Sequence, residues 1–450
     1  MVLSKELCRI FPHAIGINVR IQEGALFIQK DAIRTMPNQI IQDKEFSNAK
    51  NVVICIYIVL MSVQLVAIEG FSVSPLKVLA MLLTPLFIIR FGYHMVATDA
   101  AFYGIANLIL MAVCASFASP IVAWDRIGYR AMYVFMFILV YCIMYDGCVK
   151  MALIKRLLVV LMIAYGVIFL IQHALYLVGV RSQIFFLNYY ASITMNGVFK
   201  PNGLACEPSH SARIITVIYW GILKLSEIEL GKRISFKNAF MDMPYCSILF
   251  FISMIAMGSA TGMIGILLIL LYFFDRNFII FFIAFVGFIL MMGMEIENTQ
   301  IRRLQNVFNS FFSDDVSETL KNKEGSGAVR IMPFINTFKM DFFSASTWIG
   351  QGSVSETNFL KKVFSESRYL GDITSFGLIS YLTSQFFVYK CCIRKFFSIE
   401  TLLFLLLATF SVGSVYYTWL MLMIFMIVKY FEEHKTNIIA TESIKTHEKE

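Results

Sequence analysis

The sequence has few charged residues for its length. Only 15% of its 450 residues are Asp, Glu, Lys or Arg, whereas 58% are hydrophobic. This scarcity of charge excludes a water-soluble protein and predicts an all-α polytopic integral membrane protein surrounded by membrane lipids. The net charge of +8 does not indicate a nucleic-acid partner, because the Lys and Arg residues lie in short clusters between apolar runs.

Motifs for metals, disulfides and nucleotides are also missing. The nine cysteines form no CxxC pair and no Cys/His zinc spacing. There is no P-loop, and SDDV at 313–316 comes nearest to a paired-aspartate metal motif. We therefore expect no disulfide framework, no metal site and no cofactor. If the protein transfers a chemical group, the activated donor of that group would have to arrive on a lipid carrier, since no nucleotide-binding motif is present.

The apolar runs predict about twelve transmembrane helices, with ten as the alternative. Two runs, 245–274 and 398–430, are too long for one span and short for two. Small residues interrupt each of them, in MGSATGMIG at 257–265 and in SVGSVYYT at 411–418, so each run is expected to form two short helices. The other runs are 51–69, 75–92, 100–119, 130–147, 156–179, 211–226, 277–293 and 371–389.

The distribution of Lys and Arg predicts the topology. Basic residues are concentrated in both tails and in the connections assigned to the same side, so both termini are expected to be cytoplasmic. No apolar stretch of signal-peptide length lies in the N-terminal tail. The expected parts are a tail at 1–50, a transmembrane bundle at 51–293 with an external loop at 180–210, a large external loop at 294–370, transmembrane helices at 371–430 and a tail at 431–450.

The stretch FKPNGLACEPSHSARIITV, residues 199–217, places titratable side chains directly before an apolar run. Pro208 suits the first turn of a helix, and Glu207 and Ser209 suit its cap. A span is therefore expected to begin here at the outer face of the membrane, with the positive end of its dipole toward the external loop.

Within this stretch, Glu207, His210 and Arg213 are spaced by three and so share one side of the first two helical turns. A helix N-terminus reinforced by Arg213 and Lys200 is a candidate seat for a diphosphate, with Glu207 as a carboxylate that orients or deprotonates a sugar hydroxyl. The alternative is a structural arrangement in which Glu207 satisfies backbone amides and Arg213 reaches lipid phosphates.

A second group of candidates lies in the large loop, in EGSGAVRIMPFINTFKMDFFSASTWIGQGS at 324–353. Flexible turns are expected at 325–327 and 350–352, with an amphipathic segment between them. Arg330 is a candidate for covering the phosphates of a lipid-linked substrate, and Arg302 and Arg303 are further candidates. The alternative for each is a solvated charge near anionic headgroups.

The PNGLxxEPS stretch at 201–209, followed by GS…R and GxG in one large loop, resembles the bacterial O-antigen polymerase family and, more distantly, the O-antigen ligases. GSATG at 258–262 and GDITSFGLIS at 371–380 resemble the family too. The similarity covers roughly residues 199–380. It implies a metal-independent, C-type glycosyltransferase of the bacterial inner membrane that joins undecaprenyl-diphosphate-linked oligosaccharide repeat units at the periplasmic face.

The resemblance also implies roles for individual residues. Arg330 would take the place of the family's loop arginine, and Arg213 with Glu207 that of the EPS-containing helix. Lys200 and Asn202 belong to the same motif and are assigned to substrate binding, although similar proteins often have Arg in place of Lys200. The catalytic base is left open among Glu207, His210 and Asp341.

The resemblance favours a polymerase over a ligase. Ligases of this superfamily use a His in their large loop, and residues 294–370 contain none, although His210 can substitute. A flippase and a membrane acyltransferase are the alternatives from other classes. The sequence has neither the intramembrane Asp, Glu and His chain of an ion-coupled pump nor a convincing His-Asp pair. A chain-length regulator protein is an expected partner of a polymerase.

Overall fold

The computed structural model describes most of the apolar part of the chain. The described residues are 21–22, 25–26, 48–64, 75–91, 98–118, 124–147, 149–180, 184, 199–274, 325–352, 369–413 and 415–434. The chain divides into two compact units, Met1–Val53 and Ile54–Glu450. In the first unit, β1 (Ile21–Gln22) and β2 (Ala25–Leu26) pair antiparallel, and a helix, Asn48–Ser62, begins.

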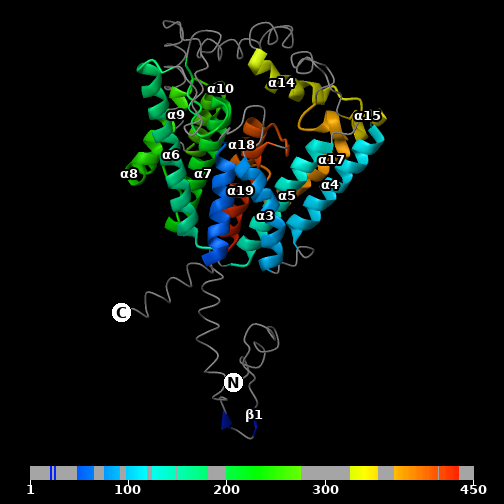
Figure 1. Ribbon diagram of the computed structural model, residues 1–450, viewed down its shortest axis with the longest axis horizontal. Helices are drawn as coiled ribbons and strands as arrows, with labels where there is room; N and C mark the ends of the chain where they lie inside the picture. The colour runs from blue at the N-terminus through cyan, green and yellow to red at the C-terminus, as the bar shows by residue number, and fades with distance from the viewer. Residues whose placement is uncertain are drawn as a thin grey trace. The chain divides into compact units, whose positions relative to one another are not determined.

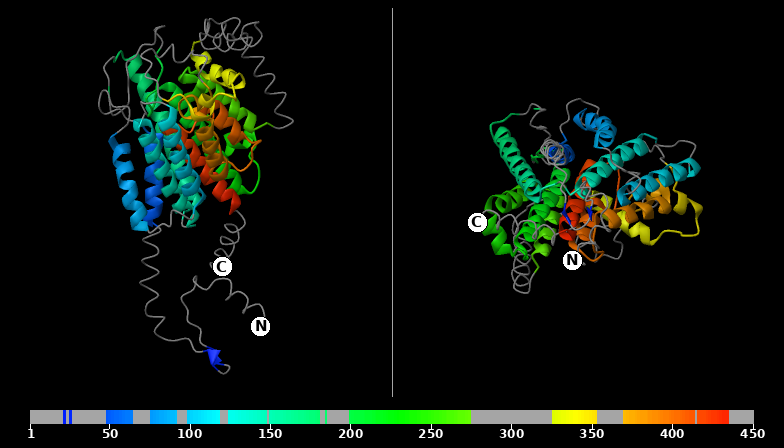
Figure 2. Two further views of the ribbon diagram at one scale, coloured as in Figure 1. Left: turned by 90° about the vertical axis from the view of Figure 1, so that its right-hand side faces the viewer. Right: turned by 90° about the horizontal axis from the view of Figure 1, so that it is seen from below.

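The second unit is helical in its described residues (Figures 1 and 2). Its helices after Ser62 are α3 (Pro75–Phe91), α4 (Asp99–Ala118), α5 (Trp124–Tyr145), α6 (Met151–Leu177), α7 (Pro208–Leu230), α8 (Phe236–Asp242), α9 (Pro244–Ala256), α10 (Ala260–Tyr272), α14 (Gly325–Phe338), α15 (Ala345–Ile349), α17 (Ile373–Cys391), α18 (Ile399–Ala408) and α19 (Tyr416–Glu433).

Three of these helices are long and apolar enough to cross a membrane, over Asp99–Phe117, Arg126–Tyr145 and Met151–Leu177. The pair α8 and α9, bent by 111°, makes a fourth if it is one span. The described chain is therefore mostly helical and compatible with an all-α membrane protein. The number of about twelve spans stays a prediction, because several other helices are shorter than the roughly 20 residues that a bilayer requires.

Both predicted interruptions of the long apolar runs are confirmed. The run 245–274 forms α9 and α10, which contact each other and are separated at Met257–Ser259. A Cβ atom at Gly262 would lie only 3.0 Å from the Met254 carbonyl oxygen, so the small residue permits this close approach. The run 398–430 forms α18 and α19, separated between Ala408 and Tyr416.

The predicted span at 211–226 corresponds to α7, which forms the core of the second unit. Helices α6, α9, α10 and α19 all pack on it. Tyr219 stacks on Phe250, and Trp220 meets Phe425 edge to face, with every one of these rings fully or almost fully buried. Aromatic packing of this kind buries a large apolar area and fixes how the helices are arranged around α7.

Gly350 and Gly377 bring the end of α15 and the residues after it against the start of α17. Gly377 interrupts α17 with a φ of +79°, and a Cβ atom there would lie 2.2 Å from the Trp348 carbonyl oxygen. The amides of Gln351 and Gly352 donate hydrogen bonds to the carbonyls of Thr374 and Ser375 at 2.8 and 3.2 Å. Gly350 and Gly352 both have positive φ and lie outside a helix, which is compatible with the predicted turn at 350–352.

The other predicted turn of the large loop is wrong. Residues 325–327 form the first turn of α14 instead of a flexible turn, because glycine is tolerated at the start of a helix whose later residues are amphipathic. The Thr337 hydroxyl near the end of α14 accepts a hydrogen bond from the Leu370 amide at 2.9 Å, which joins this helix to the start of α17.

Replacing Gly377 with Ala should lower the free energy of unfolding by about 3 kcal/mol or more, since the new methyl group meets backbone atoms at a positive φ. Gly128→Ala is the matched control, because Gly128 lies within α5 with nothing within 4 Å of its Cβ position. Thermal unfolding in one detergent measures both. Equal unfolding midpoints for the two variants would contradict the packing described here.

Candidate functional site

The first turn of α7 carries the side chains predicted to form a site. Glu207 is the N-cap residue, with φ −138° and ψ 150°, and Pro208 occupies the first helical turn, as predicted. The Glu207 carboxylate makes no capping hydrogen bond, so the structural alternative in which it satisfies backbone amides is wrong. It accepts a hydrogen bond from Ser209 Oγ at 3.3 Å, and its side chain is 65% exposed. This carboxylate is thus open to a ligand.

His210 lies between the starts of α7 and α19. Its Nε2 is 3.9 Å from Glu207 Oε2, and its Nδ1 is 3.4 Å from the Tyr416 hydroxyl. Its ring also packs against Tyr417, with the ring centroids 4.7 Å apart. The guanidinium carbon of Arg213 lies 4.5 Å from the centroid of the same Tyr417 ring. The predicted trio of Glu207, His210 and Arg213 therefore shares one face of α7.

Arg213 has hydrogen-bonding capacity that the protein does not use. The side chain is half-buried, and its Nε has no hydrogen-bond partner among the described residues. A buried donor left unpaired costs about 1–3 kcal/mol, more when it carries charge. A guanidinium held against an aromatic ring presents its remaining donors in a fixed plane, which suits the oxygens of a phosphate or carboxylate.

Lys77, in the first turn of α3, belongs to the same cluster and was missed by the analysis of motifs. Its side chain is fully buried, and its Nζ donates a hydrogen bond to Gln64 Oε1 and lies 3.5 Å from the centroid of the Tyr416 ring. Among the described residues, no Asp or Glu forms an ion pair with it. The available signal was a lysine inside the apolar run 75–92, because an ionisable residue in such a run is costly and usually functional.

Two cations therefore stack on neighbouring tyrosines, Lys77 on Tyr416 and Arg213 on Tyr417. The Cys206 thiol lies close to Lys77, and burial raises the pKa of this thiol while the charge of Lys77 opposes the shift. Because the net direction is upward, the thiol stays protonated at neutral pH and does not neutralise Lys77.

The loop before α7 is shaped by one side chain of α6. Gln172 is fully buried, and its Oε1 accepts hydrogen bonds from the amides of Asn202 and Gly203 at 3.1 and 2.9 Å. Its Nε2 donates to the Gly203 carbonyl at 3.1 Å. Gly203 adopts a φ of +60°, and a Cβ atom there would lie 3.0 Å from aromatic rings of α6. These contacts fix the conformation of the loop and so determine the position of Glu207.

The remaining predicted residues of this loop differ in exposure. Asn202 is only 6% exposed, and its Nδ2 donates to the Cys206 carbonyl at 3.4 Å, while its own carbonyl accepts a hydrogen bond from Ser211 Oγ. Asn202 thus stabilises the loop, and its contact with substrate stays a prediction. Lys200 is partly exposed on the same loop.

Most candidates of the large loop are not placed. Arg302 and Arg303 lie outside the described residues, and Arg330 belongs to α14 in a part whose side chains are not described. Asp341 is exposed in the turn after α14, where its Oδ1 accepts a hydrogen bond from the Phe343 amide at 2.9 Å. A contact of these residues with the α7 cluster stays a prediction.

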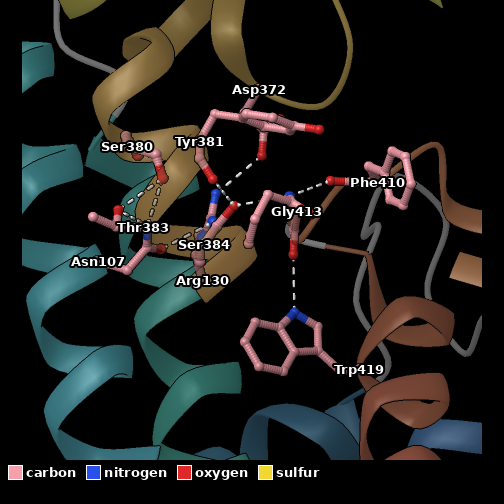
Figure 3. Close-up of polar contacts among 11 residues, drawn as sticks. Asn107, Arg130, Asp372, Ser380, Tyr381, Thr383, Ser384, Phe410, Gly413 and Trp419 are labelled. Carbon is pink, nitrogen blue, oxygen red and sulfur yellow. Dashed lines mark hydrogen bonds and ion pairs between the residues drawn. The ribbon is translucent and has the colours of Figure 1, made fainter. Parts of the chain in front are cut away.

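A second polar cluster, which the sequence did not predict, joins α4, α5 and α17 (Figure 3). Arg130 is 3% exposed; its Nη1 donates to Asp372 Oδ2 and its Nη2 to Asn107 Oδ1, both at 3.0 Å. Asn107 Nδ2 in turn donates to the Ser380 carbonyl and to Thr383 Oγ1 at 2.7 and 2.8 Å. Asp372 is 34% exposed, so it connects the buried arginine to the surface of the bundle.

Residues 411–413 and 415–417 lie between the two clusters. A Cβ atom at Gly413 would be 3.9 Å from Asp372 Oδ2, and three residues later the Tyr416 ring covers Lys77. The helices α7, α17 and α19 all begin at this end of the unit, and the dipoles of their N-termini favour negative charge. We refer to Lys77, Glu207, His210, Arg213, Tyr416 and Tyr417 as the tyrosine–cation site.

The chemistry available at the tyrosine–cation site is anion binding beside an acid–base pair. Among the described residues, no group of three or more His, Cys, Asp or Glu is placed to hold a metal ion. A cavity of about 590 Å³, open to the surface, lies at the opposite end of α7. At the tyrosine–cation site, Glu207 is exposed and His210 and Arg213 are partly exposed, so a large ligand can approach these three residues from the surface, whereas Lys77 and Tyr416 are buried behind them.

No protein-family model, curated protein or solved structure matches the chain. The fold and the site define a mostly helical chain with three or four candidate membrane spans and a cationic site at the N-termini of its helices.

Replacing Asp372 with Asn should lower the free energy of unfolding by about 3 kcal/mol, because it leaves Arg130 buried without a carboxylate. Glu229→Gln is the matched control: it breaks the ion pair with Lys155 at the surface and should cost less than about 1 kcal/mol. Unfolding in detergent compares the two variants. A control as destabilised as Asp372→Asn would refute the role assigned to the buried arginine.

Proposed function

We propose that the chain is an O-antigen or surface polysaccharide polymerase that joins undecaprenyl-diphosphate-linked oligosaccharide repeat units at the periplasmic face of the bacterial inner membrane. The sequence resemblance suggests this reaction. The observation that carries the proposal is the tyrosine–cation site, where Lys77 and Arg213 stand on adjacent tyrosines beside the Glu207 and His210 pair. A diphosphate and an attacking hydroxyl need these two kinds of group side by side.

In the proposed step, the terminal sugar hydroxyl of a new lipid-linked unit attacks the anomeric carbon of the growing chain. The bond from that carbon to the carrier diphosphate breaks, and its electron pair leaves with the diphosphate. The hydroxyl proton passes to Glu207 or His210, whose Oε2 and Nε2 atoms are 3.9 Å apart. No metal is required, because positive side chains stabilise the leaving charge.

Arg213 and Lys77 have different parts in this proposal. Arg213 is half-buried against the Tyr417 ring, so the exposed part of its guanidinium can bind a diphosphate oxygen directly. Lys77 is fully buried behind the Tyr416 ring, so it does not contact the diphosphate and instead holds that ring beside His210. Lys200, Asn202, Arg302, Arg303 and Arg330 are proposed as further contacts to the substrate.

The proposed topology has about twelve spans, both termini in the cytoplasm and the tyrosine–cation site in the periplasm. Contacts between the described helices support alternating directions. Asp99 at the start of α4 pairs with Lys390 at the end of α17, at 3.7 Å. Lys155 at the start of α6 pairs with Glu229 at the end of α7. Both helix pairs are thus antiparallel, as successive crossings of one membrane would be.

An O-antigen ligase that transfers finished polymer to lipid A-core is the second candidate, since His210 stands at the site as a base of the type that ligases use. A lipid-linked oligosaccharide flippase is less compatible with the site, because a flippase needs cations along a central path rather than at one end. A chain-length regulator is proposed as a partner of the polymerase.

Deleting the gene should leave lipid A-core that carries a single repeat unit, and complementation should restore the ladder of longer chains on a gel of surface polysaccharide. Bare core with polymer accumulating on the lipid carrier would instead establish the ligase. An unchanged ladder would overturn both glycosyl-transfer functions.

Arg213→Ala and Lys77→Met should each reduce polymer formation by about a hundredfold or more, because the first removes positive charge from the leaving diphosphate and the second removes the side chain that holds the Tyr416 ring in place. Lys155→Gln is the control, since Lys155 pairs only at the surface far from the site. Chain-length profiles of complemented cells give the activity, and the amount of membrane-inserted protein is measured beside them. Normal ladders from both site variants would refute the assignment.

A further inference from the structure

A cavity of about 590 Å³ lies at the end of the second unit opposite the tyrosine–cation site. The ends of α7, α10 and α19, the start of α18 and the connections that follow α7 and α17 line it. Helix α7 has 23 residues and is about 34 Å long at 1.5 Å per residue, so the cavity and the tyrosine–cation site are far apart. The proposed polymerisation makes no use of this cavity.

The lining of the cavity is strongly charged, and part of the charge is already paired. Lys224 Nζ lies 3.3 Å from Glu227 Oε2 and 3.7 Å from Glu432 Oε1. Arg233 Nη2 donates a hydrogen bond to the Tyr272 carbonyl at 2.6 Å, at the end of α10. These contacts form one wall of the cavity and leave its acidic side chains largely compensated.

Three further cations of the lining are not paired. Among the described residues, the side chains of Lys232, Arg394 and Lys395 have no hydrogen bond or ion pair within 4 Å, although Arg394 interacts electrostatically with Glu432, and all three are exposed. Lys232 follows α7, whereas the other two follow α17, so they reach the cavity from two separate connections. The remaining carboxylate, Glu400, lies in the first turn of α18, where the helix dipole favours it.

The sequence explains these cations as topology signals, which require no cavity. The structure adds an open cavity large enough for a small ligand, and five Lys or Arg against three Glu in its lining. Unpaired cations converging on such a volume form strong, charge-assisted hydrogen bonds with the oxygens of an anion. Their separation on two connections suits a ligand with several oxygens, as a phosphate has.

We propose that this cavity binds an anionic phosphate group through Lys232, Arg394 and Lys395. The group belongs either to the headgroup of an anionic phospholipid or to a soluble phosphate compound. Binding joins the connection after α7 to the connection after α17, so it stabilises the packing of α18 and α19 against α7.

The test uses the purified full-length chain and follows its thermal unfolding. One arm titrates inorganic phosphate in an uncharged detergent, against sodium chloride at equal ionic strength. The other arm compares bilayer discs of phosphatidylcholine alone with discs of equal parts phosphatidylcholine and phosphatidylglycerol. The cavity variant is Lys232→Gln/Arg394→Gln/Lys395→Gln. Its control, Lys150→Gln/Lys237→Gln/Lys339→Gln, removes the same charge at three exposed positions outside the cavity.

A ligand that binds only the folded state raises the unfolding midpoint in a saturable way. We expect this rise for the wild type and the control in at least one arm, with the ligand needed for half the effect increased about tenfold or more in the cavity variant. A response to phosphatidylglycerol alone assigns a lipid headgroup, and a response to phosphate alone assigns a soluble compound. No response in either arm, or equal responses of the two triple variants, overturns the proposal.

Discussion

The guanidinium of Arg130 is a positive charge enclosed by helices, and the arrangement of α4, α5 and α17 depends on how it is neutralised. Asp372 and Asn107 bind one Nη atom each, so three helices contribute to one set of hydrogen bonds. A buried charge that loses its partner costs several kcal/mol. These helices can therefore slide or rotate only as far as the two hydrogen bonds of Arg130 remain formed. This fixes the position of the start of α17.

The position of α17 in turn determines where α19 begins. Gln385 of α17 donates a hydrogen bond to the Phe410 carbonyl at 2.8 Å, within a turn where Thr409 and Phe410 both have positive φ. Gly413 then passes beside the Asp372 carboxylate, and α19 begins with Tyr416. Lys77 packs on Tyr416 and Arg213 packs on Tyr417. The buried ion pair of Arg130 and Asp372 therefore indirectly determines the geometry of the tyrosine–cation site.

Local sequence was sufficient for features that depend on neighbouring residues. The interruption of both long apolar runs followed from small residues, and the start of α7 followed from Pro208 and Glu207. Helical spacing alone placed Glu207, His210 and Arg213 on one face. The turn expected at 325–327 failed because glycine is tolerated in the first turn of a helix whose later residues are amphipathic.

The contacts between distant segments could not be predicted from the sequence. Arg130 and Asp372 are 242 residues apart, and either one read alone looks like a polar residue at the edge of an apolar run. The one local signal for Lys77 is its position inside the apolar run 75–92, and the length of that run does not reveal it. Its partners Gln64 and Tyr416 come together only through the packing of α3 and α19.

Helix α7 is enclosed along most of its length and carries charged groups at both ends. Its buried residues run from Ser211 to Ile228, and glycine at 221 lies close to Ile424 of α19, leaving no room for the helix to shift. A tilt would require repacking of large rings on several neighbours at once. The helix is thus held in one position, so under the proposed function the lipid-linked sugar moves through the membrane to reach Glu207, and the site does not move toward the sugar.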